Sequence, residues 1–296
     1  MQLTFLGTAC MMPTKERNPS AVFLQFKGEG ILFDCGEGTQ RQMKIAGIPL
    51  SKVTKICISH CHGDHIFGLP GLLLTISAID APKTVEIFGP RGSKRVFENM
   101  FGTVKFEESF KVKVTEVHEG VFFENDDFKL ECLPMKHEVP CVAFAFTEKD
   151  RRRIKVDYIK KLGIPEGPLL GELQRGKNIE FKGKKVLADD ATTVVTGKKV
   201  VFLTDTVLVE NCYKIAADAD VLICDSTFSS KLKEKAEERN HLTALEAGQI
   251  ASRAGVKKLI LTHFSARYKN TSEVEEDART AFDNVVAAFD FMKLTL

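Results

Sequence analysis

Residues 56–65 read ICISHCHGDH. The stretch opens with an apolar, β-branched run that is typical of a buried strand. His60, His62, Asp64 and His65 then follow within six positions. Imidazole and carboxylate groups are common zinc ligands, and these four cannot all face one tetrahedral ion without leaving ligands over. The stretch therefore predicts a loop at a strand end that supplies two neighbouring metals, as in a metal-dependent hydrolase.

Composition limits the remaining possibilities. The chain has 296 residues, of which 44% are hydrophobic, enough for one large core or two fused halves. A net charge of +2 means that a nucleic-acid partner must be held by a local basic patch. No apolar run approaches ~20 residues, so no membrane span is expected, and the first residues, MQLTFLG, predict a strand and not a signal peptide. Eight cysteines without a CxxC pair favour buried thiols in a reducing, cytoplasmic setting.

Apolar runs separated by glycine and proline predict an alternation of strands and helices. We expect helices over 66–78, 243–254 and 272–289, with Thr243 at or near a helix start. Strands are expected at 2–6, 21–26, 30–34, 55–59, 85–88, 128–133, 141–147, 199–203, 220–224 and 257–262. Two sheets flanked by helices, an α/β sandwich, suit this order. The runs KICISH (55–60) and KLILTH (258–263) are alike, which suggests two related halves that deliver ligands to one crevice.

A basic segment interrupts this alternation. Residues 149–161 read KDRRRIKVDYIKK, and a stretch rich in glycine and proline follows. We interpret 149–186 as an arm inserted between core strands of a single domain that spans 1–296.

Further ligand candidates follow other strand-like runs. His137, Asp205 and His263 each come just after an apolar stretch, where side chains converge in open α/β sheets. We expect them to join the loop at 60–65. His118 is expected to be an ordinary surface histidine.

The chain as a whole resembles the metallo-β-lactamase superfamily of hydrolases, and within it is similar to the ribonuclease Z family. The matching motifs are PT and RNPS within 13–20, DCGEGTQ at 34–40, HCHGDH continuing into GLPGL at 60–72, Lys136-His137, Asp205-Thr206 and HFSARY at 263–268. The histidine-rich loop is shared by the superfamily, whereas GLPGL and HFSARY are more particular. The resemblance implies a four-layer αββα sandwich with the basic arm inserted.

The resemblance also implies a metal assignment, with two zinc ions per subunit. One zinc would be bound by His60, His62 and His137, the other by Asp64, His65 and His263, and Asp205 would bridge them. Paired zinc ions can clamp both oxygens of a phosphoryl displacement and activate a water.

The implied reaction removes the 3′ trailer from precursor tRNA and leaves a 3′-hydroxyl on the tRNA. Asp64 would also accept a proton. His241, in NHLT, would act as general acid or as a donor to the scissile phosphate. The alternative for His241 is a plain histidine in a capping region, since Leu242 stands where the family pattern has a small polar residue.

Several residues are candidates for binding the substrate. Arg267 offers a planar fork for a phosphate, with Ser265 and Tyr268 as donors beside it. Arg17 and Asn18 are expected in a phosphate-contacting loop, although a surface turn explains them nearly as well. Arg151, Arg152 and Arg153 would bind phosphates of the tRNA body, unless the arm is only a structural insert. The resemblance further implies a homodimer.

Two other functions stay open. The first is another hydrolase of the superfamily that acts on small phosphodiesters, sulfates or lactones. The second is a non-catalytic RNA-binding protein that kept the fold; lost ligands would mark such a protein, and none is missing here.

Overall fold

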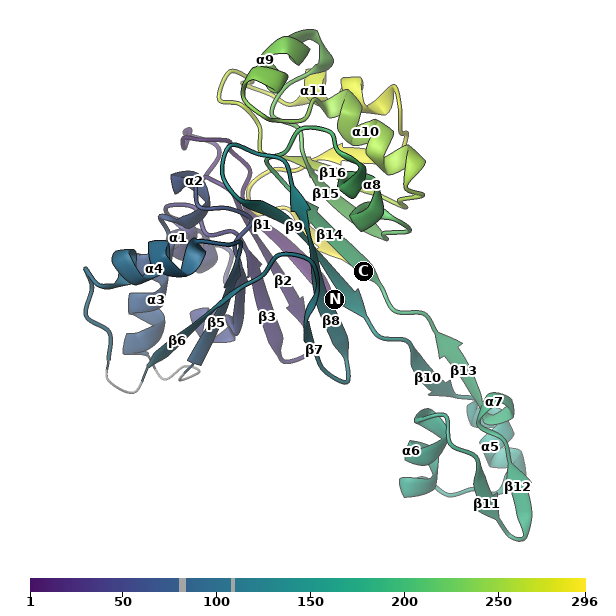
Figure 1. Cartoon of the computed structure of the whole chain (residues 1–296). Coiled ribbons are helices and arrows are strands. Elements are labelled where there is room, and N and C mark those ends of the chain that lie inside the picture. The colour runs from purple at the N-terminus through teal and green to yellow at the C-terminus, as the bar shows by residue number, and fades with distance from the viewer. Residues whose placement is uncertain (80–83, 108–109) are drawn as a thin grey trace. The chain divides into compact units, whose positions relative to one another are not determined.

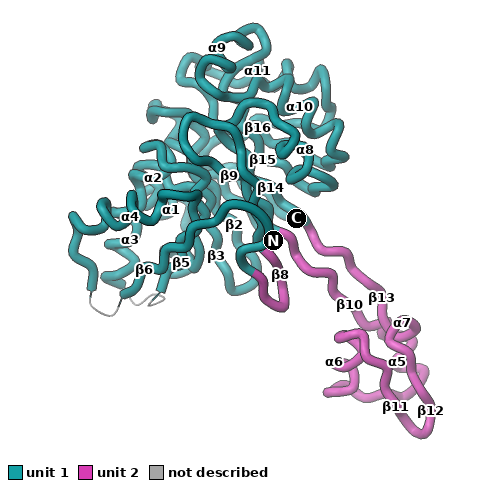
Figure 2. The backbone as a smooth tube through the Cα atoms, viewed as in Figure 1, with its two compact units in different colours: residues 1–123, 130–146, 199–296 teal, residues 124–129, 147–198 magenta. Residues whose placement is uncertain are grey.

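The computed structural model describes residues 1–79, 84–107 and 110–296, and its chain forms two compact units (Figures 1 and 2). The larger unit comprises residues 1–123, 130–146 and 199–296. The smaller unit comprises residues 124–129 and 147–198. Within the described residues, no helix combines the length and the apolar character needed to cross a membrane.

The first sheet of the larger unit has the order β18-β1-β2-β3-β4-β5-β6. Its strands are β1 (Gln2–Gly7), β2 (Ala21–Phe26), β3 (Glu29–Phe33), β4 (Lys55–Cys57), β5 (Thr84–Gly89), β6 (Lys111–Glu116) and β18 (Lys293–Thr295). Strands β1 to β3 are antiparallel, and a tight turn in which Lys27 has φ of 52° joins β2 to β3. Strands β3 to β6 are parallel. The ends of β3 and β4 therefore lie at the same edge of this sheet.

The second sheet has the order β17-β16-β15-β14-β9-β8-β7. Its strands are β7 (Gly120–Glu124), β8 (Phe128–Met135), β9 (Cys141–Glu148), β14 (Lys199–Leu203), β15 (Val221–Asp225), β16 (Leu259–Thr262) and β17 (Val285–Ala287). Strands β14 to β17 are parallel, and the residues of β15 and β16 are buried throughout. Continuous burial is what their uninterrupted apolar sequences predict for strands covered on both faces.

Helices cover the outer faces of the two sheets (Figure 1). On the first sheet they are α1 (Thr39–Ile45), α2 (Gly63–Ile66), α3 (Leu69–Ala78) and α4 (Ser93–Phe101), and on the second α8 (Glu210–Ala216), α9 (Lys233–Glu238), α10 (Ala244–Arg253) and α11 (Ser272–Arg279). Short 3₁₀ turns lie at Leu50–Lys52 and Ser230–Leu232. Between the sheets, the ring of Phe33 packs against those of Phe144 and Phe202, with centroids 6.2 and 5.5 Å away. The expected αββα sandwich is confirmed.

Two of the expected helices differ from the structure. The helix expected at 66–78 is divided, because α2 ends at Ile66 and α3 begins at Leu69. A Cβ on Gly68 would lie 2.1 Å from the Gly36 carbonyl oxygen, so only glycine lets the backbones approach here. The helix expected at 272–289 is wrong beyond Arg279. The β-branched pair Val285-Val286 forms β17 beside β16 instead, after a turn at Asp283-Asn284.

The helix expected at 243–254 is confirmed as α10, and Thr243 is its N-cap. The Thr243 hydroxyl accepts a hydrogen bond from the backbone N–H of Glu246, and the Glu246 carboxylate accepts one from the backbone N–H of Thr243. This reciprocal arrangement is a capping box.

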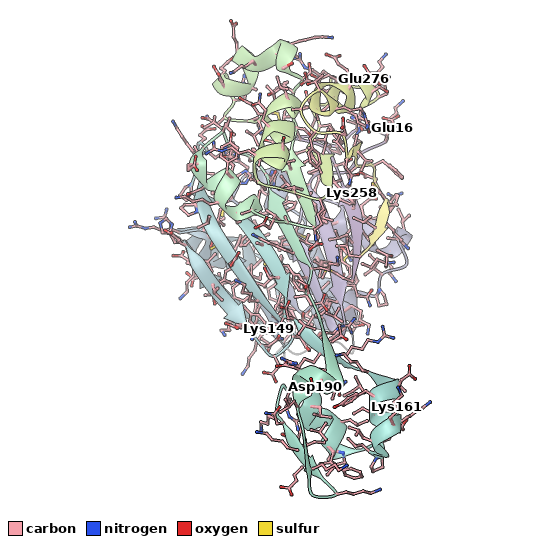
Figure 3. All side chains as sticks on the ribbon, turned by 90° about the vertical axis from the view of Figure 1, so that its right-hand side faces the viewer. Glu16, Lys149, Lys161, Asp190, Lys258 and Glu276 are labelled. Atoms are coloured by element: carbon pink, nitrogen blue, oxygen red, sulfur yellow. The ribbon has the colours of Figure 1, made fainter. Side chains whose placement is uncertain are left out.

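The smaller unit has its own secondary structure and its own apolar cluster. Strand β10 (Arg151–Ile154) pairs with β13 (Thr192–Val195), and β11 (Ile179–Phe181) pairs with β12 (Lys184–Val186). Its helices are α5 (Val156–Leu162), α6 (Pro168–Gln174) and α7 (Ala188–Ala191), and Figure 3 labels Lys161 and Asp190 on this unit. The cluster includes Ile159, Ile164, Leu173, Ile179 and Val186. The interval expected from the sequence, 149–186, leaves out β13, the partner of β10.

Candidate metal centre

The histidines and carboxylates expected to form one site come together at the ends of strands in both sheets. The loop at 60–65 follows β4 of the first sheet, whereas His137, Asp205 and His263 follow β8, β14 and β16 of the second. Asp205 and His263 have positive φ angles of 46° and 64°. Left-handed backbone is uncommon for residues other than glycine and marks places where the fold holds a side chain in a required direction.

One group consists of His60, His62 and His137. Nδ1 of His62 lies 3.1 Å from Nε2 of His60 and 3.2 Å from Nε2 of His137. All three ring nitrogens lie within 4.8 Å of one another. Three imidazole nitrogens that face a common point form a set suited to one zinc ion.

A second group consists of Asp64, His65 and His263. Oδ2 of Asp64 lies 3.3 Å from Nε2 of His65 and 3.5 Å from Nε2 of His263. The backbone N–H of Met11 donates to the same carboxylate oxygen at 2.7 Å, which fixes its direction.

Asp205 lies between the two groups. Its Oδ2 is 3.6 Å from Nε2 of His60 and 3.5 Å from Nε2 of His65, and its Oδ1 is 3.3 Å from Nδ1 of His263. Burial alone would raise the pKa of Asp205, but the imidazoles of His263 and His65 hold it well below its usual value. The carboxylate is therefore ionised, as a metal ligand must be.

The electrostatics of the centre favour a bound cation. Burial and the neighbouring His65 ring hold the pKa of His60 well below its usual value, so His60 stays neutral. Burial also acts to lower the pKa values of His65 and His263, yet Asp205 and other nearby acidic groups raise both well above the usual value; for His263 these groups include the Cys10 thiol. Positive charge is thus stabilised at the point where these two rings meet the carboxylates.

Two buried ring nitrogens support the same conclusion. Nε2 of His65 and Nε2 of His263 are fully buried and have no hydrogen-bond partner in the described part of the chain. A buried polar atom without a partner is energetically costly unless something else satisfies it. A metal ion would satisfy both, so the residues present fit a metal cofactor.

Residues behind the ligands fix which ring nitrogen faces the centre. Asp34, which follows β3 and has φ of 56°, accepts hydrogen bonds from Nδ1 of His65 at 2.6 Å and from Oγ of Ser59 at 2.9 Å. Because Oγ of Ser59 donates to Asp34, it accepts from Nδ1 of His60 at 3.0 Å. Nδ1 of each ring is therefore occupied by a hydrogen bond, and Nε2 is the atom through which each ring would bind a metal. Asp34 lies in the DCGEGTQ motif, and its place after an apolar strand was the signal in the sequence for this role.

Asp225 and Thr227 play the same part in the second sheet, and neither was predicted from the sequence. Oδ2 of Asp225 lies 3.0 Å from Nδ1 of His241. Thr227 donates its hydroxyl hydrogen to Asp225 and accepts from Nδ1 of His263 at 3.1 Å. Burial would lower the pKa of His241, but Asp225 and Asp205 raise it to about 10, so this imidazole keeps a proton. In the sequence, the position of Asp225 at the end of an apolar run was the only indication of this role.

A cavity of about 770 Å³ opens over this centre. Its wall includes Asp64, Asp205 and His241, with Lys235 and Arg239 from α9 and the turn after it. Cys10, for which no role was predicted from the sequence, lines it as well. The volume is within the range of ligand pockets, roughly 300–1,000 Å³.

The proposed substrate-binding residues lie in different surroundings. Among the described residues, the cavity wall includes Ser265 but neither Arg267 nor Tyr268. Arg267 is exposed, with its guanidinium 5.5 Å from the Phe228 ring centroid. Tyr268 is buried, and its hydroxyl accepts a hydrogen bond from the backbone N–H of Ser229, so the structure does not bring Tyr268 to the cavity.

Arg17 and Asn18 brace the N-terminal loop. Nη1 of Arg17 donates to the carbonyl oxygen of Tyr268 at 2.7 Å, and Nδ2 of Asn18 donates to that of Glu37 at 2.7 Å. Both side chains therefore hold neighbouring loops in place. His118 is exposed, as expected.

The three arginines of the basic run belong to the smaller unit, on β10. Arg151 and Arg153 are exposed, whereas Arg152 is half-buried and forms an ion pair with Asp189 at 2.6 Å. Arg152 also donates to the Thr192 hydroxyl at 3.0 Å, across to β13. Arg151 and Arg153 thus keep more of their surface available to a partner than Arg152 does.

Comparisons with known proteins agree with this centre. Ribonuclease Z of Methanothermobacter thermautotrophicus is 40% identical over 99% of the chain and 95% of its own length, and ribonuclease Z of Archaeoglobus fulgidus is 40% identical over 99% and 97%. The crystal structure of the short form of human tRNase Z matches with a TM-score of 0.73 at 28% identity, covering 100% of this chain and 99% of that one. A family model described as anti-Pycsar protein Apyc1 matches residues 1–152. The chain therefore belongs to the ribonuclease Z family, and its residues 1–152 also belong to the family that the Apyc1 model describes.

Proposed function

We propose that this protein is a zinc-dependent endoribonuclease that removes the 3′ trailer from precursor tRNA. The observation that carries the proposal is the buried cluster beside the cavity, in which Nε2 of His65 and Nε2 of His263 have no hydrogen-bond partner among the described residues. The ribonuclease Z relatives, matched over nearly the whole chain, support the choice of reaction.

The two groups of ligands would hold two zinc ions per subunit. His60, His62 and His137 would bind one, Asp64, His65 and His263 the other, and Asp205 would lie between them. When bound, such a pair supplies Lewis acidity to the scissile phosphate and lowers the pKa of a water.

The chain's own residues supply the proton transfers. Asp64 accepts the proton of the attacking water, and the hydrogen bond from the N–H of Met11 holds its carboxylate in position. His241 is protonated and aligned by Asp225, so it donates a proton to the 3′ oxygen of the tRNA as that oxygen leaves. The products are a tRNA with a 3′-hydroxyl and a trailer with a 5′-phosphate.

Incubation with an end-labelled tRNA precursor, with and without chelator, tests the reaction, and elemental analysis counts zinc per chain. We expect a single cut at the 3′ side that chelator abolishes, and about two zinc ions per chain. Replacing His241 with alanine should slow cleavage without loss of zinc. Tight tRNA binding with no bound metal and no cleavage would instead identify a non-catalytic RNA-binding protein.

The smaller unit would bind the tRNA body through Arg151, Arg152 and Arg153. Because these side chains would contact phosphates, the affinity should fall steeply with salt. The backbone N–H of Glu148 donates to the carbonyl oxygen of Lys198 at 2.9 Å, so the two ends of the segment lie together. A short turn can therefore replace residues 149–197. This deletion should abolish tRNA cleavage and spare hydrolysis of a small chromogenic phosphodiester, whereas unchanged tRNA cleavage would refute this role.

The protein is also proposed to act as a homodimer in the cytoplasm. Light scattering of the purified protein would measure the oligomeric state directly, and a mass equal to one chain would refute the dimer.

A further inference from the structure

Phe67 has an unusual position for a large apolar side chain. It directly follows α2, and its backbone N–H donates to the Gly63 carbonyl oxygen at 2.9 Å. A Cβ placed on Gly63 would lie 2.4 Å from Cε2 of Phe67, so the ring lies over the backbone between His62 and Asp64. The residue is nevertheless 63% exposed and lines the cavity. Part of the ring therefore rests on the metal-ligand loop and the rest is open.

Other exposed apolar side chains surround the same opening. Met11 is 73% exposed and Met12 is 50% exposed, and both line the cavity with Phe67. Lys235 and Arg239 line it too, so apolar surface and positive charge occur in one cavity. Nucleotides combine these two properties, because each carries a flat π-face and an anionic phosphate.

We propose that Phe67 stacks on the base of a nucleotide that flanks the scissile phosphate. This inference rests on the proposed function, because it takes the phosphate to lie at the His and Asp cluster. The ring covers Gly63, whose chain neighbours His62 and Asp64 both belong to that cluster, so the open face is adjacent to the reacting phosphate. The thioethers of Met11 and Met12 are suited to the edge of an aromatic base.

Stacking on an aromatic ring would also suit precursor tRNAs whose bases at the cut differ. Every base has a π-face, so an aromatic platform holds a nucleotide without selecting its sequence. The chain contains no tryptophan and only three tyrosines. An exposed phenylalanine beside the reaction centre is therefore well placed to position the strand at the cut.

The test measures kcat/KM for wild type, Phe67→Leu and Phe67→Tyr on three tRNA precursors. One precursor is intact, one is abasic on the 5′ side of the scissile phosphate, and one is abasic on the 3′ side. On the intact precursor, Phe67→Leu should lose roughly 5- to 150-fold, the range that one base–aromatic stack supplies, and Phe67→Tyr should stay close to wild type. On one of the abasic precursors, wild type should fall by the same factor and Phe67→Leu should fall no further.

Two controls separate this role from a structural one. Phe289 is 64% exposed but does not line the cavity, so Phe289→Leu should cleave all three precursors as wild type does. Zinc per chain should be equal in wild type and Phe67→Leu. If kcat/KM of Phe67→Leu is lower than that of wild type by the same factor on all three precursors, the ring only supports the loop and the proposal is overturned.

Two further outcomes would also overturn it. A change of molecular mass by light scattering in Phe67→Leu would show that a second copy of the chain covers the ring. If wild type cleaves the intact precursor and Phe67→Leu cleaves it equally well, the stacking role is refuted and the proposed function is not. Absence of wild-type cleavage of the intact precursor would instead contradict the proposed function itself, so the two failures are distinguishable.

Discussion

Replacing Asp34 with asparagine tests how the buried hydrogen-bond network controls the metal ligands. Asp34 is fully buried, and its carboxylate accepts from the backbone N–H of Ser59 at 2.8 Å, from Oγ of Ser59 at 2.9 Å and from Nδ1 of His65 at 2.6 Å. Its φ of 56° suits asparagine as well as aspartate, so the backbone is preserved. The substitution therefore changes the hydrogen bonding of Asp34 and removes the negative charge that it places beside His65.

The side-chain amide introduced by Asp34→Asn would replace one acceptor oxygen with an NH₂ donor. If the amide oxygen keeps the bond to the Ser59 N–H, the NH₂ group faces Nδ1 of His65. The ring then has to place its proton on Nε2, the atom that lies 3.3 Å from Asp64. Changing such a supporting group lowers metal affinity by roughly 10- to 100-fold. A mismatched buried donor further lowers the free energy of unfolding by about 1–3 kcal/mol.

Zinc affinity measured by competition with a chromophoric chelator, together with thermal unfolding, checks this prediction. Asp220→Asn is the matched control, because Asp220 is 7% exposed and accepts from the backbone N–H of Lys199 and from Nζ of Lys257, outside the metal centre. Both variants should melt at lower temperature, and only Asp34→Asn should lose zinc affinity. Wild-type zinc affinity in Asp34→Asn would refute the reasoning.

Asp64→Ala should lose cleavage far more than tRNA affinity, measured by single-turnover kinetics and by filter binding; equal losses would contradict its catalytic role. Asp290 is buried enough to raise its pKa to about 6, despite hydrogen bonds from the Asn18 N–H and the Thr8 hydroxyl. A carboxyl whose pKa is higher in the folded protein stabilises it below about pH 4 and loses that contribution as the pH rises to about 6. The melting temperature of Asp290→Asn should therefore rise relative to wild type across that window, and the opposite trend would show that the hydrogen bonds outweigh burial. Thr243→Ala removes the capping box of α10 and should lower stability by about 0.5–2 kcal/mol in thermal unfolding, while Thr243→Ser should restore it; no difference between the two would refute the capping argument.

Particular elements show why some of the fold was predictable from sequence. The runs at β14 and β15 are short, apolar and β-branched, so their identity as buried strands follows from composition alone. Thr243 and Glu246 form a capping box that depends only on residues three apart. The end of α11 was mispredicted because residues 280–289 are compatible with a helix locally. Pairing with β16 makes Val285–Ala287 a strand, and that pairing joins distant parts of the chain.

In the metal centre, too, some residues could be predicted from the local sequence and others only from contacts between distant parts of the chain. The loop at 60–65 could be predicted to bind metal because four potential ligands, three histidines and one aspartate, fall within six positions. Asp34 and Asp225 carried no comparable signal, since a single aspartate after a strand is common. Their roles follow from the contacts they make with His65 and His241, which lie 31 and 16 positions away.

The sequence by itself determined that histidines and carboxylates stand at strand ends, because that pattern depends on neighbours along the chain. Only the tertiary structure decided which ring nitrogens face the centre and which aspartates hold them there. It also placed Phe67 on Gly63, with the rest of its ring exposed to the cavity. The contact of 3.2 Å between Nδ1 of His62, which follows a strand of the first sheet, and Nε2 of His137, which follows a strand of the second, requires the two sheets to be packed at a fixed distance. No local sequence pattern contains that distance.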